Sequence, residues 1–199
     1  PGWGEPQRMT DGGVLDGDVA IVTGAGRNIG EAIATRFAAE GARVVVADVD
    51  EERAAETVEA IEAEGGEAAV AAVDVTDEAQ VREMVATAED AFGPVDVLVN
   101  NVAISDRTGL LELPVEEWDR VLAVNLRGTF LCTREVAKSM RDSGGGRIVN
   151  VASTSAHRGR PEAAAYATSK AGILNFTRSA AKALAEHDIR VNTLSPTRS

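Results

Sequence analysis

The sequence lacks the features that mark secreted and membrane proteins. Its 199 residues include a single cysteine, Cys132, which cannot form an internal disulfide. The apolar neighbours of Cys132 predict a buried helix position. No run of about 18 apolar residues occurs, and no charged segment followed by an apolar one opens the chain. We therefore expect a cytoplasmic protein with no membrane partner.

Basic residues are also scarce. The chain has 32 acidic and 20 basic side chains, a formal net charge of −12. This surplus of negative charge argues against general affinity for nucleic acid or anionic lipid, and it favours a small-molecule partner. Only three residues are lysines: Lys138, Lys170 and Lys182. A lysine that stands one helical turn from a tyrosine is therefore less easily explained by chance. No metal site is predicted.

Length and hydrophobicity fit one folded domain. With 199 residues, of which 44% are hydrophobic, the chain can bury a sizeable core. Residues 1–17 are rich in glycine and polar residues without a helical or strand period, so we expect an N-terminal tail. Residues 18–199 form the single predicted domain.

Short apolar runs alternate with amphipathic segments along this domain. The runs predict strands at residues 18–23, 42–48, 68–73, 95–99, 147–151 and 190–194. Helices are expected at residues 31–40, 51–64, 78–92 after a cap at Asp77, 115–143, and around Tyr166. Such alternation predicts an α/β fold, a doubly wound parallel sheet with helices on both faces, which is Rossmann-like.

A glycine-rich turn follows the first predicted strand. It runs from Thr23 to Gly30 and leads directly into a helix. Backbone N–H groups in such a turn, together with the helix N-terminus, can bind a diphosphate. The last glycine falls one residue later than in G-x-G-x-x-G, and a strand-to-helix turn that merely needs glycine remains the alternative. The candidate cofactor-binding residues here are Gly24, Arg27, Asn28 and Ile29.

Acidic and amide side chains end the next three strands. Asp48 follows Gly30 by 18 residues, where a carboxylate can accept hydrogen bonds from the ribose hydroxyls of adenosine and repel a 2′-phosphate. This favours NAD over NADP, although NADP stays possible and an ordinary turn aspartate is an alternative. Asp74 can reach the adenine from the third strand, and Asn100 and Asn101 end the fourth.

Tyr166 and Lys170 lie one helical turn apart and share a helix face. A free phenol has a pKa of about 10 and is a poor acid or base at neutral pH. A positive charge at roughly 4 Å favours phenolate by up to about 4 kcal/mol at an effective dielectric of about 20. We expect this to bring the pKa of Tyr166 near 7, although a tyrosine at the core edge beside a solvated lysine has the same spacing.

These motifs occur in the order and spacing of the classical short-chain dehydrogenase/reductase family, which the chain resembles from about Gly17 to its end. They are Thr23-Gly24, Asn28-Ile29-Gly30, Asp74-Val75, Asn100-Asn101-Val102-Ala103, Asn125, Ser153 and Tyr166-x-x-x-Lys170. The resemblance implies that Tyr166 exchanges a proton with the substrate oxygen, that Lys170 lowers the pKa of Tyr166 and holds the nicotinamide ribose, and that Ser153 binds the substrate oxygen. It also implies that Asn125 supports a water relay, and it adds Val75, Asn101, Tyr166 and Lys170 to the cofactor-binding residues.

The sequence departs from the family pattern at three places. Asn28 stands where the family has the middle glycine, and asparagine tolerates a positive φ better than most residues. Val102 and Ala103 replace the alanine and glycine that follow the paired asparagines. Relatives usually continue beyond the strand at 190–194, so we expect the family's C-terminal segment to be missing from these 199 residues, either because the record is truncated or because the chain is a fragment.

Three hypotheses for function follow. The first is an NAD-dependent oxidoreductase that interconverts a secondary alcohol and a ketone. The second is an NADPH-dependent 3-oxoacyl-carrier-protein reductase, and the third is a dinucleotide-binding protein without catalysis. His157, Arg158 and Arg160 either line the substrate entrance or are solvated loop residues. The resemblance implies a homodimer or homotetramer, with a dimer formed through the helices at 115–143 and 163–186.

Overall fold

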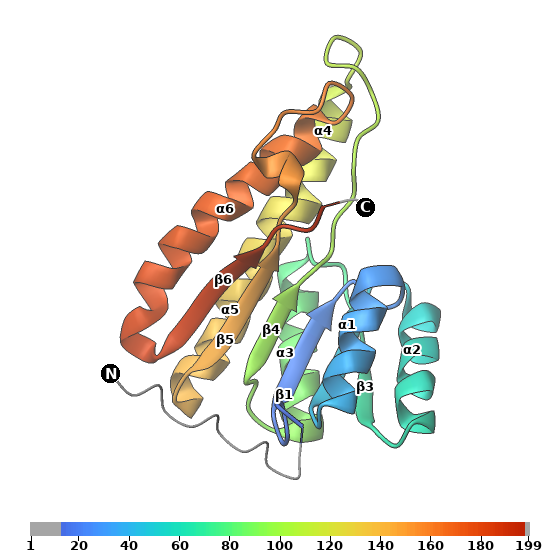
Figure 1. Ribbon diagram of the computed structural model, residues 1–199, viewed down its shortest axis with the longest axis vertical. Coiled ribbons are helices and arrows are strands. Elements are labelled where there is room, and N and C mark those ends of the chain that lie inside the picture. Colours follow the sequence, from blue (N-terminus) through green and yellow to red (C-terminus); the bar gives the residue numbers. More distant parts are fainter. Residues whose placement is uncertain (1–12, 198–199) are drawn as a thin grey trace, which may run out of the picture.

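The computed structural model of the chain describes residues 13–197 (Figure 1). Six strands form one sheet in the order β3-β2-β1-β4-β5-β6, and every neighbouring pair is parallel. The strands are β1 (Val19–Thr23), β2 (Arg43–Asp48), β3 (Glu67–Ala72), β4 (Val97–Asn100), β5 (Gly146–Val151) and β6 (Ile189–Leu194). All six predicted strands are confirmed, with ends that shift by one or two residues.

The strand order reverses between β1 and β4. The chain builds β2 and β3 on one side of β1 and then crosses to place β4 on its other side. The connections that leave β1 and β4 therefore diverge above their carboxyl ends, and ligands of doubly wound sheets bind in the crevice this creates. The glycine turn follows β1, and Asn101 follows β4, so the fold places both at this edge.

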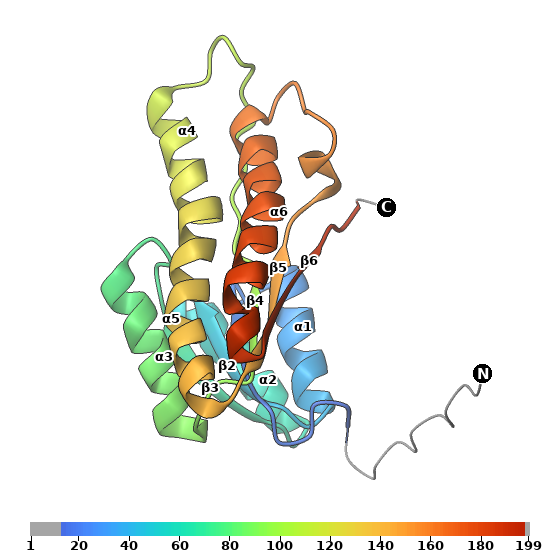
Figure 2. The same cartoon turned by 90° about the vertical axis from the view of Figure 1, so that its left-hand side faces the viewer.

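Helices cover both faces of the sheet, as predicted. On one face, α1 (Asn28–Ala39) and α2 (Glu51–Ala63) pack against alternate side chains of β1 and β2. On the other face lie α3 (Glu78–Phe92), α5 (Gly128–Ser143) and α6 (Ala164–Leu184), and Figure 2 shows α5 and α6 side by side. The apolar runs of β1 and β2 are needed because both faces of these strands are buried. Helix α1 begins three residues earlier than the predicted start at Glu31.

The predicted helix at 115–143 is helical throughout but has three parts. These are α4 (Val115–Leu122), a π-helical turn (Ala123–Arg127) and α5. The π-turn contains Asn125, one of the predicted catalytic residues, whose side chain is fully buried. Single π-turns inside α-helices are frequent at functional sites, and nothing in the sequence periodicity revealed this one.

Part of the predicted N-terminal tail is attached to the domain. Of this tail, residues 1–12 lie outside the described residues. Residues 13–17 are bonded to the rest of the domain: the N–H of Leu15 donates to the carbonyl of Glu40 over 3.0 Å, and Arg43 donates to the carbonyl of Gly17 over 2.9 Å.

Cys132 is 1% exposed in the core, as predicted, and burial raises the pKa of its thiol to about 12 against the lowering effect of a backbone hydrogen bond.

Candidate active site

The glycine turn between β1 and α1 leaves no room for a side chain at Gly30. Gly24 has a φ of +65°. A Cβ on Gly30 would lie 2.0 Å from the carbonyl oxygen of Gly24 and 2.7 Å from Nδ2 of Asn101. Asn28 has a φ of 53°, so the prediction that asparagine keeps the turn of the family's middle glycine is confirmed. The turn thus brings backbone rather than side chains to the crevice.

The first turn of α1 differs from those of its neighbours. The Asp50 and Asp77 carboxylates accept hydrogen bonds from the first N–H groups of α2 and α3. No side chain among residues 13–197 does the same for α1, which begins at Asn28. The first N–H groups of a helix need a partner, and an anion is a favourable one because of the helix dipole. This turn therefore has the donors that a diphosphate requires.

Asp48, at the end of β2, already has backbone partners. Its Oδ2 accepts a hydrogen bond from the N–H of Gly26 over 3.0 Å, and its Oδ1 accepts from the N–H of Asp50 over 3.1 Å. These bonds are the turn-aspartate role that the sequence left open. A carboxylate offers about four acceptor sites, so each oxygen retains one for a further donor such as a ribose hydroxyl.

Asn101 connects β4 to the glycine turn. Its Nδ2 donates to the carbonyl oxygens of Thr23 and Gly24, each over 3.1 Å. Its backbone N–H donates to the hydroxyl of Thr23 over 3.1 Å. Its neighbour Asn100 points into the core, where its amide bonds Thr133 and Asn150. Only the second asparagine of the pair therefore joins the crevice.

The remaining candidate cofactor-binding residues form no side-chain hydrogen bond to the glycine turn among the described residues. Oδ1 of Asp74 accepts hydrogen bonds from both the N–H and the hydroxyl of Thr76, so the carboxylate organises its own turn. Val75 is 5% exposed and would contact any Cβ placed on Gly128 of α5. Arg27 and Ile29 are exposed at the start of α1.

Tyr166 and Lys170 lie on α6, one turn apart as predicted. Lys170 is 1% exposed, and its Nζ lies 5.7 Å from the centroid of the Tyr166 ring. Nζ donates to the carbonyl oxygen of Val151 over 2.6 Å. Burial lowers the pKa of Lys170 from 10.5 to about 8, which still leaves an ammonium group at neutral pH. Tyr166 itself is half-buried.

Ser153 follows β5 by two residues and begins a short 3₁₀ turn, Thr154–Ala156, that contacts α6. Its Oγ accepts a hydrogen bond from the N–H of Ser155 over 3.1 Å. This contact uses a lone pair, and the hydroxyl proton of Ser153 is free to be donated. Val151, whose carbonyl accepts the hydrogen bond of Lys170, is the last residue of β5. The end of β5 therefore positions both Ser153 and the ammonium group of Lys170.

Asn125 has a buried side chain with three hydrogen bonds. Its Oδ1 accepts from the N–H of Ile104, and its Nδ2 donates to the carbonyl of Ile104, both over 2.8 Å. Nδ2 also donates to Oγ of Ser169 over 3.0 Å. Both amide hydrogens are therefore used by protein groups, so the side chain ties the loop after β4 to α6.

Asp106 is a residue that sequence reasoning missed. It lies in the loop after β4, is completely buried, and accepts hydrogen bonds from the N–H groups of Ala165 and Tyr166. Asp106 precedes Ala165 by 59 residues and Tyr166 by 60, so spacing gave no signal. The only sequence hint is that Ala163, the residue before α6, cannot cap the helix with its own side chain.

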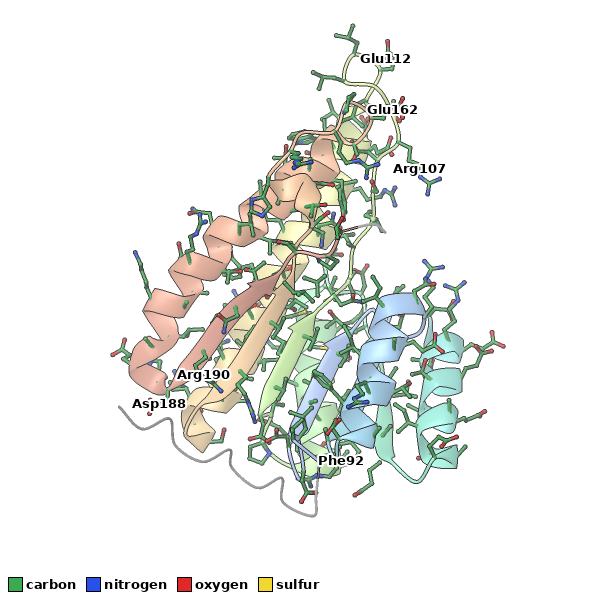
Figure 3. All side chains as sticks on the ribbon, viewed as in Figure 1. Phe92, Arg107, Glu112, Glu162, Asp188 and Arg190 are labelled. Atoms are coloured by element: carbon green, nitrogen blue, oxygen red, sulfur yellow. The ribbon has the colours of Figure 1, made fainter. Side chains whose placement is uncertain are left out.

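Exposed loop side chains lie beyond the carboxyl edge of the sheet. Figure 3 labels Arg107, Glu112 and Glu162 at the end of the molecule beyond the strand ends. His157, Arg158 and Arg160 are all exposed there. Exposure fits either the entrance or the solvated-loop interpretation of these three residues, and both stay open.

The site thus joins an uncapped glycine turn, a carboxylate at the end of β2, and a Ser, Tyr and Lys group around β5 and α6. Residues 18–198 match the sequence profile of the short chain dehydrogenases. The chain belongs to the short-chain dehydrogenase/reductase family. This family consists of oxidoreductases that use nicotinamide dinucleotides, and the resemblance inferred from the motifs is confirmed.

Individual relatives agree with this assignment. The chain is 43% identical over 183 residues to an uncharacterised oxidoreductase of Thermotoga maritima, a match that covers 92% of this chain and 72% of the relative. It is 42% identical over 183 residues to a 3-oxoacyl-(acyl-carrier-protein) reductase of Synechocystis sp., with 92% and 74% covered. The solved structure of NAD⁺-bound xylitol dehydrogenase has a TM-score of 0.90 and 37% identity, and the match covers 92% of this chain and 71% of that one.

Within residues 13–197, no group of three or more His, Cys, Asp or Glu side chains is arranged to hold a metal ion. None of the helices described is both long enough and apolar enough to cross a membrane.

Proposed function

We propose that this chain is an NAD-preferring oxidoreductase that interconverts a secondary alcohol and a ketone. The observation that carries the proposal is the buried Lys170 ammonium beside the ring of Tyr166. Burying an unpaired charge is unfavourable, and a helix that needed only packing would hold an apolar side chain there. The position instead supplies a positive charge to the only tyrosine of the sequence.

In this proposal, Tyr166 moves the proton of the substrate oxygen. Lys170 favours the phenolate by its charge, so Tyr166 can accept the hydroxyl proton of an alcohol and return it to a ketone in the reverse direction. The nicotinamide supplies the hydride chemistry when the cofactor is bound. Val151 takes one of the three N–H donors of Lys170, which leaves donors for the phenol oxygen and a ribose hydroxyl.

Ser153 and Asn125 have supporting roles. The Ser153 hydroxyl donates its proton to the substrate oxygen, since its bond from the N–H of Ser155 uses only an acceptor lone pair. The Asn125 side chain has used both amide hydrogens on Ile104 and Ser169. We therefore propose that any water relay at Asn125 uses other atoms than its side-chain N–H groups.

The cofactor site fits a dinucleotide. Gly24, Asn28 and the first N–H groups of α1 would hold the diphosphate, with Arg27 and Ile29 at the exposed rim. Asp48 would accept the adenosine ribose hydroxyls with its remaining lone pairs, which favours NAD because a 2′-phosphate would meet a carboxylate. Asp74 and Val75 would border the adenine, and Asn101 the nicotinamide side.

A carrier-linked 3-oxoacyl reductase is the second candidate. The 42% identity to the Synechocystis reductase favours it. Acidic carrier proteins need a basic docking surface, however, and a net charge of −12 opposes such docking. NADPH dependence would also conflict with Asp48.

Turnover measurements test the proposal. NADH and NADPH oxidation over a panel of ketones, and the reverse reaction over secondary alcohols and polyols, should reveal an NAD-linked activity. Tyr166→Phe should then lower kcat by roughly 10²- to 10⁴-fold, the usual contribution of a general acid or base, while the affinity for NADH changes little. Ser153→Ala, a variant of another member of the proposed Ser, Tyr and Lys group, should also lower kcat.

Each other outcome has a definite meaning. Substantial activity in Tyr166→Phe would remove Tyr166 from the mechanism. Cofactor binding without turnover of any tested ketone or alcohol would support the dinucleotide-binding hypothesis. A higher kcat/KM with NADPH and an acyl-carrier substrate would support the second candidate.

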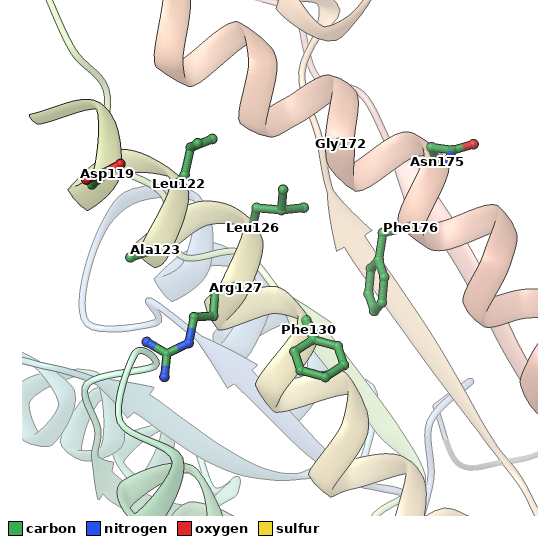
Figure 4. A pocket seen from close by; sticks show the side chains of 9 residues that line it. All are labelled: Asp119, Leu122, Ala123, Leu126, Arg127, Phe130, Gly172, Asn175 and Phe176. Atoms are coloured by element: carbon green, nitrogen blue, oxygen red, sulfur yellow. The ribbon is translucent and has the colours of Figure 1, made fainter. Parts of the chain in front are cut away.

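We also propose that the chain forms a dimer through α4, α5 and α6. Figure 4 shows an open groove between these helices, which is lined by Leu122, Leu126, Phe130 and Phe176. The rings of Phe130 and Phe176 lie 6.1 Å apart between centroids. The side chain of Phe130 is 41% exposed, and large apolar side chains that are exposed together are typical of protein–protein interfaces. Light scattering on these 199 residues should give a dimer, and a stable monomer at micromolar concentration would count against this interface.

A further inference from the structure

Tyr166 has an unusual backbone environment for a residue in the first turn of a helix. Its N–H donates to Oδ1 of Asp106 over 2.9 Å, and the neighbouring N–H of Ala165 donates to Oδ2 over 3.1 Å. Its carbonyl oxygen accepts a hydrogen bond from Oγ of Ser169 over 2.7 Å. Both polar backbone groups of Tyr166 are therefore bonded to side chains.

The capping group comes from another part of the chain. Most helices are capped by the residue just before their first turn, as Asp77 caps α3. In α6 that residue is Ala163, and the cap is the carboxylate of Asp106, which is 59 residues before Ala165. Asp106 is completely buried, so the carboxylate was removed from water to make these two bonds.

The segment that carries Asp106 is itself fixed at two points. Ile104 forms a reciprocal pair of hydrogen bonds with the amide of Asn125. Asn101 bonds the carbonyl oxygens of Thr23 and Gly24 in the glycine turn. Residues 101–106 therefore connect the turn proposed to hold the cofactor with the first turn of the helix that carries Tyr166.

We propose that Asp106 is a positioning residue for Tyr166: its two hydrogen bonds fix the first turn of α6 relative to the cofactor turn, so that the phenol stands at a defined place. The inference rests on the proposed function, since it assumes that Tyr166 moves the proton. A carboxylate suits this role because both oxygens accept and the helix N-terminus favours negative charge. A misplacement of about 1 Å can lower the rate of a reaction by roughly 10²-fold.

A cap that served stability alone would have a different signature. Its loss would lower the folded fraction and leave each folded molecule as active as before. A positioning residue lowers kcat per folded site while the KM for the cofactor stays nearly constant, because Asp106 contacts the tyrosine helix and not the cofactor turn. The two roles are separated when kcat is divided by the number of NADH-binding sites measured in the same sample.

The test compares Asp106→Ala and Asp106→Asn with Asp77→Ala. Asp77 also accepts two backbone N–H groups at a helix start, from Ala79 and Gln80, so its removal is a matched loss of a cap at α3. We expect Asp106→Ala to lower kcat per site by roughly 10- to 100-fold. Asp106→Asn, which retains one acceptor oxygen, should lie between Asp106→Ala and wild type, and Asp77→Ala should keep the wild-type kcat per site.

Amide hydrogen exchange gives a readout that needs no turnover. Asp106→Ala should accelerate exchange at the N–H groups of Ala165 and Tyr166 relative to Ala180 in the same helix, because only the first turn loses its acceptor. Should Asp106→Ala fold poorly, Asp106→Asn carries the same comparison.

The outcomes for the two levels of proposal are distinguishable. Wild-type activity that persists in Tyr166→Phe would overturn the proposed function, whatever Asp106 does. Loss of activity in Tyr166→Phe, together with a kcat per site in both Asp106 variants within twofold of wild type, would overturn the positioning role alone. Equal losses in Asp106→Ala and Asp77→Ala would also overturn it.

Discussion

The proposed cofactor side and the proposed proton-transfer side of this site are built by different means. Around the glycine turn, the hydrogen bonds use the backbone atoms of the turn, which Asp48 and Asn101 bind from outside, and a Cβ at Gly30 would overlap the carbonyl of Gly24. Around α6, the contacts are made by buried side chains, among them Asn125, Asp106 and Lys170. The first side depends on the absence of side chains at its glycines, and the second depends on the functional groups of its side chains.

The difference follows from the chemistry proposed for each side. A diphosphate is bound by N–H groups, and these are accessible only where side chains are absent. Proton transfer needs charges whose effect is not weakened by water, and such charges must be buried and held by hydrogen bonds. We therefore expect the cofactor side to be sensitive to added atoms and the proton-transfer side to removed functional groups.

Lys170→Met is expected to have the largest effect. It removes the ammonium that stands 5.7 Å from the centroid of the Tyr166 ring and should lower kcat by roughly 10²-fold or more, since the charge that favours proton transfer by the phenol is lost. The same change should stabilise the fold at pH 7, because it replaces a buried charge with an apolar side chain of similar length. Steady-state kinetics and urea unfolding of the two proteins measure both effects.

The pH dependence of this stability difference has a defined sign. The pKa of Lys170 is lowered by burial to about 8 in the folded chain, against 10.5 for an ordinary lysine. Between these values the unfolded state binds more protons, so the wild type gains stability as pH rises from about 8 to 10.5, by up to about 3 kcal/mol. The advantage of Lys170→Met should therefore be greatest below pH 8, and an advantage that grew with pH would contradict the burial of a charged lysine.

Gly30→Ala tests the cofactor side. The added Cβ would lie 2.0 Å from the Gly24 carbonyl, so the turn must shift. We expect a loss of about 1–3 kcal/mol in the free energy of unfolding, typical of overpacking, and a clear rise in the dissociation constant for NADH. Gly159→Ala is the matched control, because no described atom lies within 4 Å of a Cβ built there. Equal NADH affinity in wild type and Gly30→Ala would show that the turn does not bind the cofactor.

Asp48→Ala is expected to have the smallest effect on activity and to sharpen the cofactor assignment. The ratio of kcat/KM for NADPH to that for NADH should rise several-fold, because the carboxylate no longer repels a 2′-phosphate. Loss of the hydrogen bonds to Gly26 and Asp50 should lower stability by about 1 kcal/mol. Asp142→Ala removes one negative charge from an exposed position and serves as the control. An unchanged ratio would leave Asp48 with its turn role only.

Much of the fold could be predicted because its signals are local. Continuous apolar runs marked strands buried on both faces, and amphipathic segments such as 51–64 marked helices with one inward side. The conformation of the glycine turn was also predictable, since glycine and Asn28 act through their own backbone conformation. The start of α1 was placed too late because an uncapped helix carries no cap residue to mark its beginning.

The strand and helix order, the glycine turn and the one-turn spacing of Tyr166 and Lys170 could be predicted from sequence, because each depends on residues within a few positions of one another. The burial of Lys170, the bonds of the Asn125 amide to Ile104 and Ser169, and the capping of the Tyr166 helix by Asp106 became visible only in the folded chain. These contacts join segments 21 to 60 residues apart, from Asn125 and Ile104 at one extreme to Tyr166 and Asp106 at the other. Their partners are set by the packing of the loop after β4 against α6, and hydrophobic periodicity carries no information about which polar groups such packing brings together.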